Sequence, residues 1–247
     1  MMSASRTAII TPAYNAARTL GSIYERIPAQ AWAQIQRIFV VDDGSTDNTW
    51  AVIQQLAEKY DILQPLRHEV NRGYGGAEKT LLDAALADEA EIVVMLHADG
   101  QYSPEKILDL LNPFQHGDAG MVQGSRMLAG GALKGGMPFY KYIANKCLTA
   151  VENLVLGLRL AEYHSGYMLY HRRALEAIPY HQLSDSFDFD MEMIVMSRVL
   201  NLRLVEVAIP TIYADEVSYL NPVKYGLDIL SVLWRYKRGD YHRLVGL

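Results

Sequence analysis

The stretch Arg37-Ile38-Phe39-Val40-Val41-Asp42-Asp43-Gly44-Ser45 decides the fold class of this 247-residue chain. Its apolar run up to Val41 is typical of a buried strand, and acidic and small turn residues follow at once. A helical pattern then continues from about Asp47 to Tyr60, with Ser45 or Thr46 as the expected N-cap. A strand, a polar turn and a helix in this order indicate one unit of a parallel α/β sheet.

The same unit recurs on both sides of this stretch. Further strands are expected at residues 8–10, 62–67 and 91–96, and helices at 17–27, 73–87 and from Ser103 onward. The alternation predicts an α/β fold with a mostly parallel, Rossmann-like central sheet that is flanked by helices.

The second half of the chain is less regular. Strands are expected at 120–125, 167–171 and 202–209, and helices at 138–156, 188–199 and 223–238. The segment Met127–Gly136 holds four glycines and is predicted to be a mobile loop, which would serve as a lid over an acceptor or as a simple connector. The chain shows no repeat and no linker, so we expect a single domain over 1–247.

Composition excludes several classes of protein. A net charge of −5 argues against a nucleic-acid binder, which usually needs a basic surface. The single cysteine, Cys147, excludes an internal disulfide and a zinc site built from cysteines. The polar start Met1–Arg6 does not resemble a signal peptide, and no apolar run reaches the length of a membrane span. We therefore expect a cytoplasmic protein, at most peripheral at the cytoplasmic face of a membrane.

Polar residues follow three of the expected strands. They are the clusters Thr11–Asn15, Asp42–Asp47 and His97–Gln101. Asp-Gly-Ser on its own is ordinary turn chemistry, but ligands of parallel sheets bind beyond the carboxyl ends of the strands. Three such clusters at one edge therefore favour a single ligand cleft.

Asp99 has the chemistry of a metal ligand in that cleft. A nucleotide diphosphate leaves readily only when its charge is neutralised, and the hard cations that do this prefer carboxylate oxygens. His97 lies two residues earlier and points the same way on an extended chain, so it is a candidate second ligand that suits Mn²⁺ better than Mg²⁺. The alternative for His97 is a hydrogen bond to the backbone at the end of a strand.

These clusters, with several later segments, resemble family 2 glycosyltransferases of the GT-A fold, and among them the polyprenyl-phosphate sugar synthases. The matching segments, in family order, are Ile10–Asn15, Val40–Asp47, Asn71–Ala77, Ala98–Gln101, Gly124–Arg126 and Ser165–Tyr167. The resemblance implies a nucleotide-binding half at about 1–126, an acceptor half at about 127–247, a nucleotide-sugar donor, and Mn²⁺ or Mg²⁺.

The resemblance also implies roles for individual residues. Those expected to bind substrate are Pro12, Tyr14, Asn15, Asp42, Asp43, Arg72, Gly73, Ala98, Asp99 and Ser165. Asp43 would hold the base or ribose with Asp42 beside it, and Asp99 would bind the metal, with His97 as a possible partner. Arg126 would meet the donor diphosphate or an acceptor phosphate, which suits a planar guanidinium.

The acceptor decides whether the reaction needs a base. The resemblance implies inversion by direct displacement, with a polyprenyl phosphate or a glycan hydroxyl as the attacking group. A phosphate is ionised near neutral pH, whereas a hydroxyl needs a carboxylate within reach. Asp190 is our choice because Phe189-Asp190-Met191-Glu192 resembles a family motif. Asp188 and Glu192, which share a helix face, are alternatives. All three carboxylates could instead simply stabilise the start of the helix through its dipole.

The chain departs from the family pattern at several positions. His97 stands where an aspartate is usual, Glu162 where a shorter acidic residue is expected, and Met168 near where the synthases often carry an arginine. A non-catalytic protein that binds nucleotide-sugars therefore stays an alternative, as does a transferase that acts on a soluble sugar hydroxyl.

The last expected helix has an apolar stripe with basic residues around it. The stripe holds Val223, Leu227, Leu230 and Trp234. It predicts either a peripheral membrane contact or a helix packed on the core.

Overall fold

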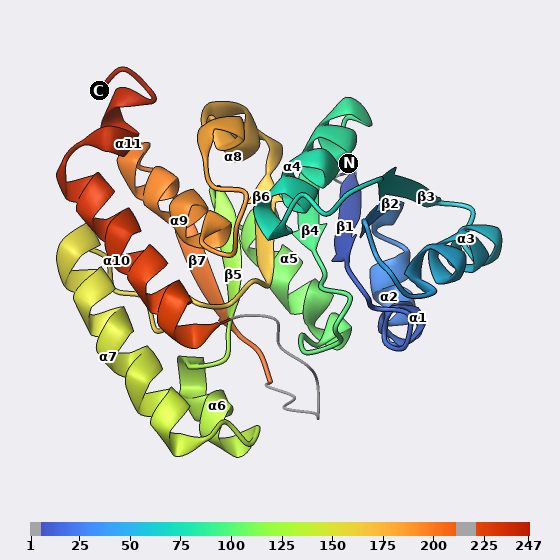
Figure 1. The fold of residues 1–247 in the computed structure, drawn as a ribbon, viewed down its shortest axis with the longest axis horizontal. Coiled ribbons are helices and arrows are strands. Elements are labelled where there is room, and N and C mark those ends of the chain that lie inside the picture. The colour runs from blue at the N-terminus through green and yellow to red at the C-terminus, as the bar shows by residue number, and fades with distance from the viewer. Residues whose placement is uncertain (1–5, 211–220) are drawn as a thin grey trace.

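The computed structural model describes residues 6–210 and 221–247. Except for Arg6, the start of the chain that was judged unlike a signal peptide lies outside these ranges. The described strands form one seven-stranded sheet in the order β3-β2-β1-β4-β6-β5-β7 (Figure 1). Their bounds are β1 Thr7–Ala13, β2 Ile35–Asp43, β3 Leu63–His68, β4 Ile92–Met95, β5 Met121–Ser125, β6 Met168–His171 and β7 Leu204–Ala208.

Helices connect and cover these strands. Those before β5 are α1 Leu20–Glu25, α2 Ala29–Trp32, α3 Thr49–Lys59, α4 Tyr74–Ala87 and α5 Ile107–Gln115. Those after β5 are α6 Gly131–Lys134, α7 Phe139–Leu156, α8 Arg172–Ala177, α9 Phe189–Val199, α10 Pro222–Lys237 and α11 Asp240–Arg243. Short 3₁₀ turns occur at Pro104–Lys106, Leu128–Gly130 and Tyr180–Gln182.

The sheet is mostly parallel, as the sequence predicts. Strand β1 pairs in parallel with β2 and β4, β3 pairs in parallel with β2, and β7 pairs in parallel with β5. Only β6 among the described strands runs antiparallel, between β4 and β5. The first four strands therefore bring their carboxyl ends to one edge of the sheet.

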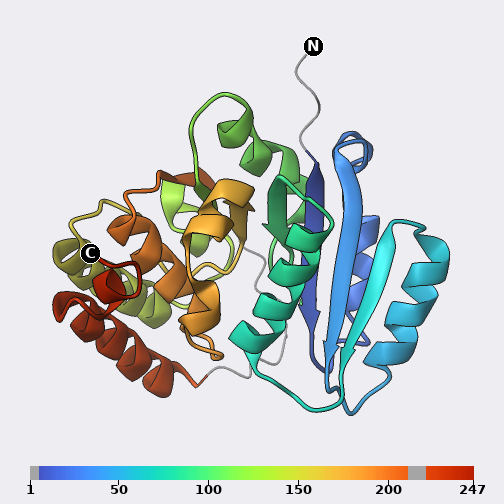
Figure 2. The same cartoon turned by 90° about the horizontal axis from the view of Figure 1, so that it is seen from above.

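Alternating side chains divide the core into two layers. Ile10 and Phe39 pack on one face of the sheet with α4 and α9, while Ile9 and Ile38 pack on the other with α1, α3 and α5. This alternation follows from the two-residue period of a strand, and burial on both faces explains why the strands are apolar throughout. Figure 2 shows the helices on both sides of the sheet.

Two expectations about local structure were wrong. The helix expected at 17–27 is shorter, and α2 follows separately after Pro28, whose ring nitrogen carries no hydrogen to donate. The predicted loop at 127–136 contains a 3₁₀ turn and α6. Met127, Ala132 and Met137 form a small apolar cluster there, and this burial gives the glycine-rich segment a defined path.

Helix α8 was not anticipated from the sequence pattern. The ring of His171 caps it by accepting a hydrogen bond from the backbone N–H of Arg173. Among the described residues, no helix has the length and apolarity to cross a membrane.

Candidate active site

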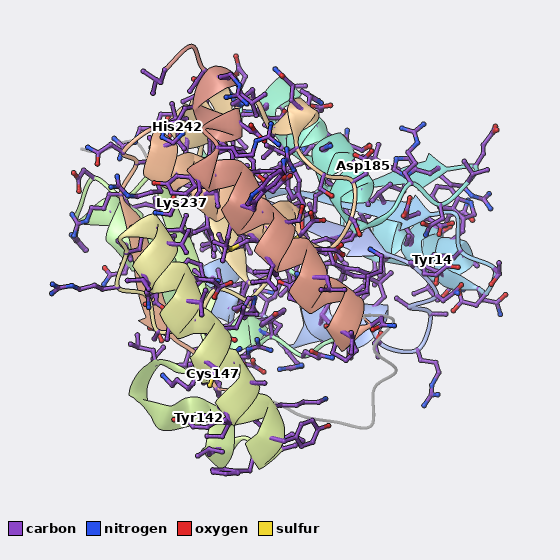
Figure 3. All side chains as sticks on the ribbon, turned by 60° about the vertical axis from the view of Figure 1, so that its left-hand side comes forward. Tyr14, Tyr142, Cys147, Asp185, Lys237 and His242 are labelled. Carbon is purple, nitrogen blue, oxygen red and sulfur yellow. The ribbon has the colours of Figure 1, made fainter. Side chains whose placement is uncertain are left out.

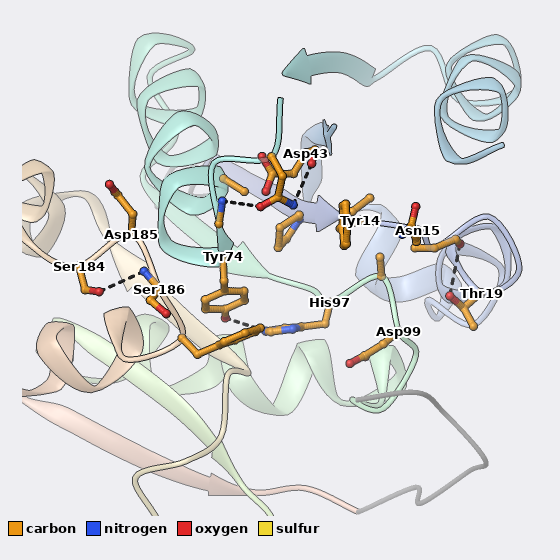
Figure 4. A pocket seen from close by; sticks show the side chains of 18 of the residues that line it. Tyr14, Asn15, Thr19, Asp43, Tyr74, His97, Asp99, Ser184, Asp185 and Ser186 are labelled. Atoms are coloured by element: carbon orange, nitrogen blue, oxygen red, sulfur yellow. Dashed lines mark hydrogen bonds between the residues drawn. The ribbon is translucent and has the colours of Figure 1, made fainter. Parts of the chain in front are cut away.

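A cavity of about 880 Å³ lies beyond the carboxyl ends of β1, β2 and β4 (Figure 4). This is where parallel sheets bind ligands, and the volume suits a nucleotide-sized molecule. The cavity is lined by Pro12, Ala13, Tyr14, Asn15, Ala16, Arg18, Thr19, Asp43, Asn71, Gly73, Tyr74, Ala77, His97, Ala98, Asp99, Ser184, Asp185, Ser186 and Phe187. All three polar clusters that the sequence singled out therefore contribute to one site.

Asn15 joins the loop after β1 to the loop after β2. The backbone of Asn15 is left-handed, at φ 49°, a conformation that asparagine tolerates better than most residues. Its Oδ1 accepts a hydrogen bond from the Thr46 N–H at 2.9 Å, and its own N–H donates to Ser45 Oγ at 2.9 Å. These bonds hold one wall of the cavity, which Pro12 and Tyr14 also line.

Asp43 presents a carboxylate whose position is set by its neighbours. Its Oδ1 accepts hydrogen bonds from Arg72 N–H at 2.9 Å and lies 2.7 Å from His68 Nδ1. His68 ends β3 directly opposite Asp43 in the parallel register. His68 was not predicted from the sequence, although parallel pairing of β2 with β3 places a histidine at the end of β3 opposite Asp43.

Asp42 does not join Asp43 in the cavity wall. Its side chain is fully buried, with Oδ1 accepting from the Ser45 N–H at 3.0 Å and Oδ2 lying 3.5 Å from Arg67 Nε. Successive side chains of a strand point to opposite faces, so Asp42 and Asp43 cannot both face the same ligand from β2. Asp42 shapes the turn, and the expected place beside the nucleotide is corrected.

His97 is held by its Nε2 atom, which lies 2.9 Å from the Gly166 carbonyl oxygen and 3.1 Å from Tyr74 Oη. A carbonyl only accepts hydrogen bonds, so Nε2 carries a hydrogen, and Nδ1 has a free lone pair whenever the ring is neutral. A Cβ atom at Gly166 would lie 2.6 Å from Nε2, so the glycine makes room for the ring. The expected backbone hydrogen bond is present, and it leaves Nδ1 available to a metal.

Asp99 lies in a tight turn after β4. Its Oδ1 accepts from the Gln101 N–H at 3.0 Å, and Gly100 between them has φ 74°, which favours glycine. Within residues 6–210 and 221–247, no three His, Cys, Asp or Glu side chains gather as a ready metal cage. Asp99 and His97 therefore fit a metal only if a diphosphate and water complete its shell, an arrangement typical of Mg²⁺ with phosphates.

Tyr74 connects the cavity to the interior and was not singled out from the sequence. Its Oη donates to Asp190 Oδ2 at 2.8 Å, and its ring stacks on His97 and on Phe187, each at 5.5 Å between ring centres. Its position at the start of α4, just after Gly73, is the local signal that could have pointed to it.

The segment 184–187 forms a further wall that sequence reasoning missed, because no strand precedes it. A Cβ atom at Gly75 would lie 2.4 Å from the Ser184 carbonyl oxygen, so this segment packs directly on the glycines that open α4. The glycine-rich start of α4 thus serves close packing of two backbones.

Asp190, the predicted base, lies behind Tyr74 and outside the lining of the cavity. Burial raises the pKa of its carboxyl to about 6, although the charge of His97 and hydrogen bonds from Tyr74 and Tyr170 act in the opposite direction. Such a pKa suits a base near neutral pH. In this structure Asp190 is connected to the cavity through the Tyr74 hydroxyl, and its role as a base for an acceptor stays a prediction.

The two alternative bases on the same segment have structural partners. Asp188 accepts from Ser184 Oγ at 2.6 Å. Glu192 is fully buried and accepts from Tyr241 Oη at 2.6 Å and from Arg235. Glu192 therefore anchors the C-terminal helices.

Glu78 of α4 is a second buried carboxyl beside Asp190. Neither of its oxygens has a hydrogen-bond partner among the described residues. Burial, reinforced by the charge of Asp190, raises the pKa of Glu78 well above its usual range. The raised pKa favours the neutral form of Glu78, which avoids an unpaired buried charge.

Arg126, Ser165 and Arg72 do not line the main cavity, and their expected contacts with donor or acceptor stay predictions. The Arg126 guanidinium binds the buried carboxylate of Glu162. Ser165 is buried and its Oγ donates to the Gly124 carbonyl. Arg72 lines a smaller cavity of about 440 Å³ with Lys79 and His181.

Comparisons with known proteins identify relatives of this chain. The model of the family described as "Glycosyl transferase family 2" matches residues 8–178. The chain is 27% identical, over 84% of its length and 86% of the relative's, to a UDP-N-acetylglucosamine–dolichyl-phosphate N-acetylglucosaminyltransferase of Methanococcus voltae. It is 29% identical, over 85% of its length and 78% of the relative's, to a polyprenol monophosphomannose synthase of Mycolicibacterium smegmatis.

A solved structure is similar in fold. Glucosyl-3-phosphoglycerate synthase of Mycobacterium tuberculosis, crystallised with Mn²⁺, UDP and glucosyl-3-phosphoglycerate, aligns with a TM-score of 0.66. The alignment covers 93% of this chain and 78% of that chain, at 18% identity.

Proposed function

Because this chain belongs to glycosyltransferase family 2, we propose that it moves a sugar from a nucleotide-diphosphate donor to a polyprenyl phosphate. The observation that carries the proposal is the meeting of Asp43, His97 and Asp99 in one cavity at the carboxyl ends of β2 and β4. The two relatives described above are named for polyprenyl- or dolichyl-phosphate products or acceptors, which supports this acceptor class.

The proposed reaction is a single displacement at the anomeric carbon. An oxygen of the acceptor phosphate attacks that carbon while the bond to the nucleotide diphosphate breaks, and the configuration inverts. The phosphate is already ionised near neutral pH, so it needs no base in contact with it. This agrees with the position of Asp190 behind Tyr74.

In this proposal, different residues of the cavity bind different parts of the donor. Asp43 accepts hydrogen bonds from the base or ribose, beside Pro12, Tyr14 and Asn15. Asp99 and Nδ1 of His97 hold Mn²⁺ or Mg²⁺, which when bound neutralises the charge of the leaving diphosphate. The hydrogen bonds of His97 to Gly166 and Tyr74 keep its ring in one orientation, as outer partners of metal-binding histidines commonly do.

A polyprenyl tail stays in a bilayer, so the proposed reaction takes place at a membrane surface. We place the protein peripherally, at the cytoplasmic face, with α10 as a contact. Its outer side exposes Val223, Leu227 and Trp234, whose exposed fractions are 74%, 64% and 59%. These values favour the membrane contact predicted for this helix over complete packing on the core.

A transfer assay tests the proposal. The purified protein is incubated with Mn²⁺, a polyprenyl phosphate and labelled UDP- or GDP-sugars, and sugar in the lipid phase is measured. We expect one donor to yield a lipid-linked sugar. Binding of a nucleotide diphosphate without transfer to any acceptor would instead support a non-catalytic binding protein, and transfer only to a sugar hydroxyl would replace the acceptor class.

The variant Asp99→Ala should lose at least about 100-fold in transfer rate, because a group that stabilises the leaving diphosphate contributes on that scale. Its thermal unfolding should stay close to that of the unmodified protein, since Asp99 is partly exposed. Asp109→Ala is the matched control, because Asp109 is an exposed partner of Lys106 on α5. Full activity of Asp99→Ala would remove Asp99 from the metal site.

A further inference from the structure

The outer side of α7 is apolar from Phe139 to Leu154. Its exposed residues are Phe139, Tyr140, Lys141, Ile143, Ala144, Cys147, Ala150, Val151 and Leu154. Steps of three and four residues place most of them on one face of the helix. The exposed fraction reaches 71% at Tyr140 and 83% at Leu154. A surface helix normally turns polar residues to solvent, so an apolar outer face of this length indicates an interaction site.

Helix α10 lies beside α7, and the two helices are in contact (Figures 1 and 3). Their inner sides share one core, to which α7 contributes Leu156 and α10 contributes Ile229 and Leu233. Two neighbouring helices that pack on the same core turn their outer sides the same way. The α10 stripe of Val223, Leu227, Leu230 and Trp234 therefore continues the apolar face of α7.

Charges around this face are positive. Exposed or half-buried cations of this face are Lys141 and Lys146 on α7 and Lys237 and Arg238 on or directly after α10, whereas Arg235 pairs with the buried Glu192 and Lys224 with Asp228. The acidic residues of the two helices are Glu152, which is buried, and Asp228, which pairs with Lys224 at 2.8 Å. The whole chain carries −5, so this cationic edge is a local feature.

An anionic bilayer fits this combination better than a second copy of the chain does. Lysine and arginine near a membrane surface each gain attraction from acidic lipids, and the apolar side chains enter the boundary of the acyl chains. A symmetric contact between two copies would bring the same cations together without exposed acidic partners from these helices.

The inner side of α10 is connected to the candidate active site. Tyr225, in the first turn of α10, lies with its Oη 3.1 Å from Nδ1 of His164. Two residues after His164, the Gly166 carbonyl accepts from His97 in the cavity. Helix α10 thus links a membrane on its outer side to the segment that holds His97.

We propose that the outer sides of α7 and α10 form one docking surface for anionic lipid bilayers, with α7 as the half that the sequence pattern of the last helix does not reveal. The docking proposal rests on the proposed function in one respect: docking would serve to deliver the lipid acceptor. Docking itself requires no acceptor, so the two can be tested separately.

Cys147 provides a direct test, because it is the single cysteine of the chain and lies exposed on the outer side of α7. An environment-sensitive fluorophore attached there should shift to the blue when vesicles containing phosphatidylglycerol are added. Vesicles of phosphatidylcholine alone should give a much smaller shift. The same fluorophore on Glu58→Cys in a Cys147→Ser background, on the exposed side of α3, should show no shift.

Sedimentation with vesicles tests the unlabelled protein. Leu154→Glu on α7 and Leu227→Glu on α10 should each weaken binding to anionic vesicles about tenfold or more. Each variant removes a leucine that the bilayer would bury and adds a negative charge. Val70→Glu is the matched control at another exposed apolar residue, between β3 and α4, and should bind like the unmodified protein.

Three outcomes would overturn the docking surface. They are absence of binding to anionic vesicles, equal binding by Leu154→Glu, and a dimer in solution that Leu154→Glu converts to a monomer. Transfer to a short, water-soluble polyprenyl phosphate is measured in parallel. If that transfer occurs without vesicle binding, only the docking surface fails, whereas vesicle binding without any transfer leaves docking intact and removes the proposed function.

Discussion

At the scale of single residues, the cavity combines a few ligand-facing groups with buried partners that fix them. Asp43 is oriented by His68, and His97 by Gly166 and Tyr74. The substitution of histidine for the family's usual aspartate at position 97 is accommodated because Gly166 leaves room for the ring. If His97 binds the metal as proposed, this exchange favours Mn²⁺ over Mg²⁺, since imidazole suits Mn²⁺ better.

The variant His97→Asp should keep or raise transfer activity and shift the preferred metal toward Mg²⁺, because it replaces a nitrogen ligand by a carboxylate. Rates measured across a series of Mn²⁺ and Mg²⁺ concentrations check this. His116→Asp, on an exposed residue after α5, is the control. An unchanged ratio of rates with the two metals would show that His97 is not a ligand.

Glu78→Gln should change how stability depends on pH. The pKa of Glu78 in the folded protein lies above its ordinary value of 4.5, so the folded state holds a proton that the unfolded state releases. The free energy of unfolding therefore falls as pH rises above about 4.5, until the folded-state pKa is passed. Glutamine carries no such proton, so this part of the decline should vanish.

Urea unfolding of Glu78→Gln at several pH values between 5 and 8 gives the measurement. Glu58→Gln, on an exposed residue of α3, should follow the unmodified protein. If Glu78→Gln loses stability with pH as steeply as the unmodified protein does, the carboxyl of Glu78 is already ionised in the folded state.

At the scale of elements, the glycine-rich start of α4 and the segment 184–187 depend on each other. Gly73 takes φ 82° and, like Gly75, allows a backbone carbonyl of that segment to come close. The first residues of α9 then place Asp190 behind Tyr74, and Glu192, two residues further, holds α10 and α11. The cavity wall and the C-terminal helices are thus joined through α9.

Glu192→Ala should lower the free energy of unfolding by about 2–4 kcal/mol, because it leaves the Ser184 N–H, the Tyr241 hydroxyl and Arg235 without their buried acceptor. Urea denaturation checks the value. Glu176→Ala removes an exposed i,i+4 partner of Arg172 and should cost less than about 1 kcal/mol. Equal losses in the two variants would contradict an anchoring role for Glu192.

At the scale of the whole molecule, the parallel strands bring residues from the first hundred positions together, and the segment 184–187 from the second half of the chain adds a further wall. The cavity lining includes Tyr14 from the start of the chain and Phe187 from the second half. A donor bound there contacts both halves and should stabilise the folded chain as one unit.

A nucleotide diphosphate of the right base, added with Mn²⁺, should therefore raise the melting temperature. At about one hundred times its dissociation constant, a ligand specific for the folded state contributes about 2.7 kcal/mol, which corresponds to roughly 5–10 °C for a chain of this size. Thermal shift with UDP, GDP and the other diphosphates measures it. The shift should shrink with Mn²⁺ omitted, and a shift of the same size without metal would contradict a shared site.

The sequence by itself determined the mostly parallel sheet and the three polar clusters at its carboxyl edge. Short apolar runs such as Arg37–Val41 are read from local periodicity, and parallel pairing then sends the strand ends to one place. Only the tertiary structure decided which of the singled-out residues face the cavity. Asp42, Arg126 and Asp190 make hydrogen bonds within the protein, His68 supports Asp43, and Tyr74 and Phe187 line the cavity. Side-chain direction of this kind depends on contacts between segments far apart in the chain.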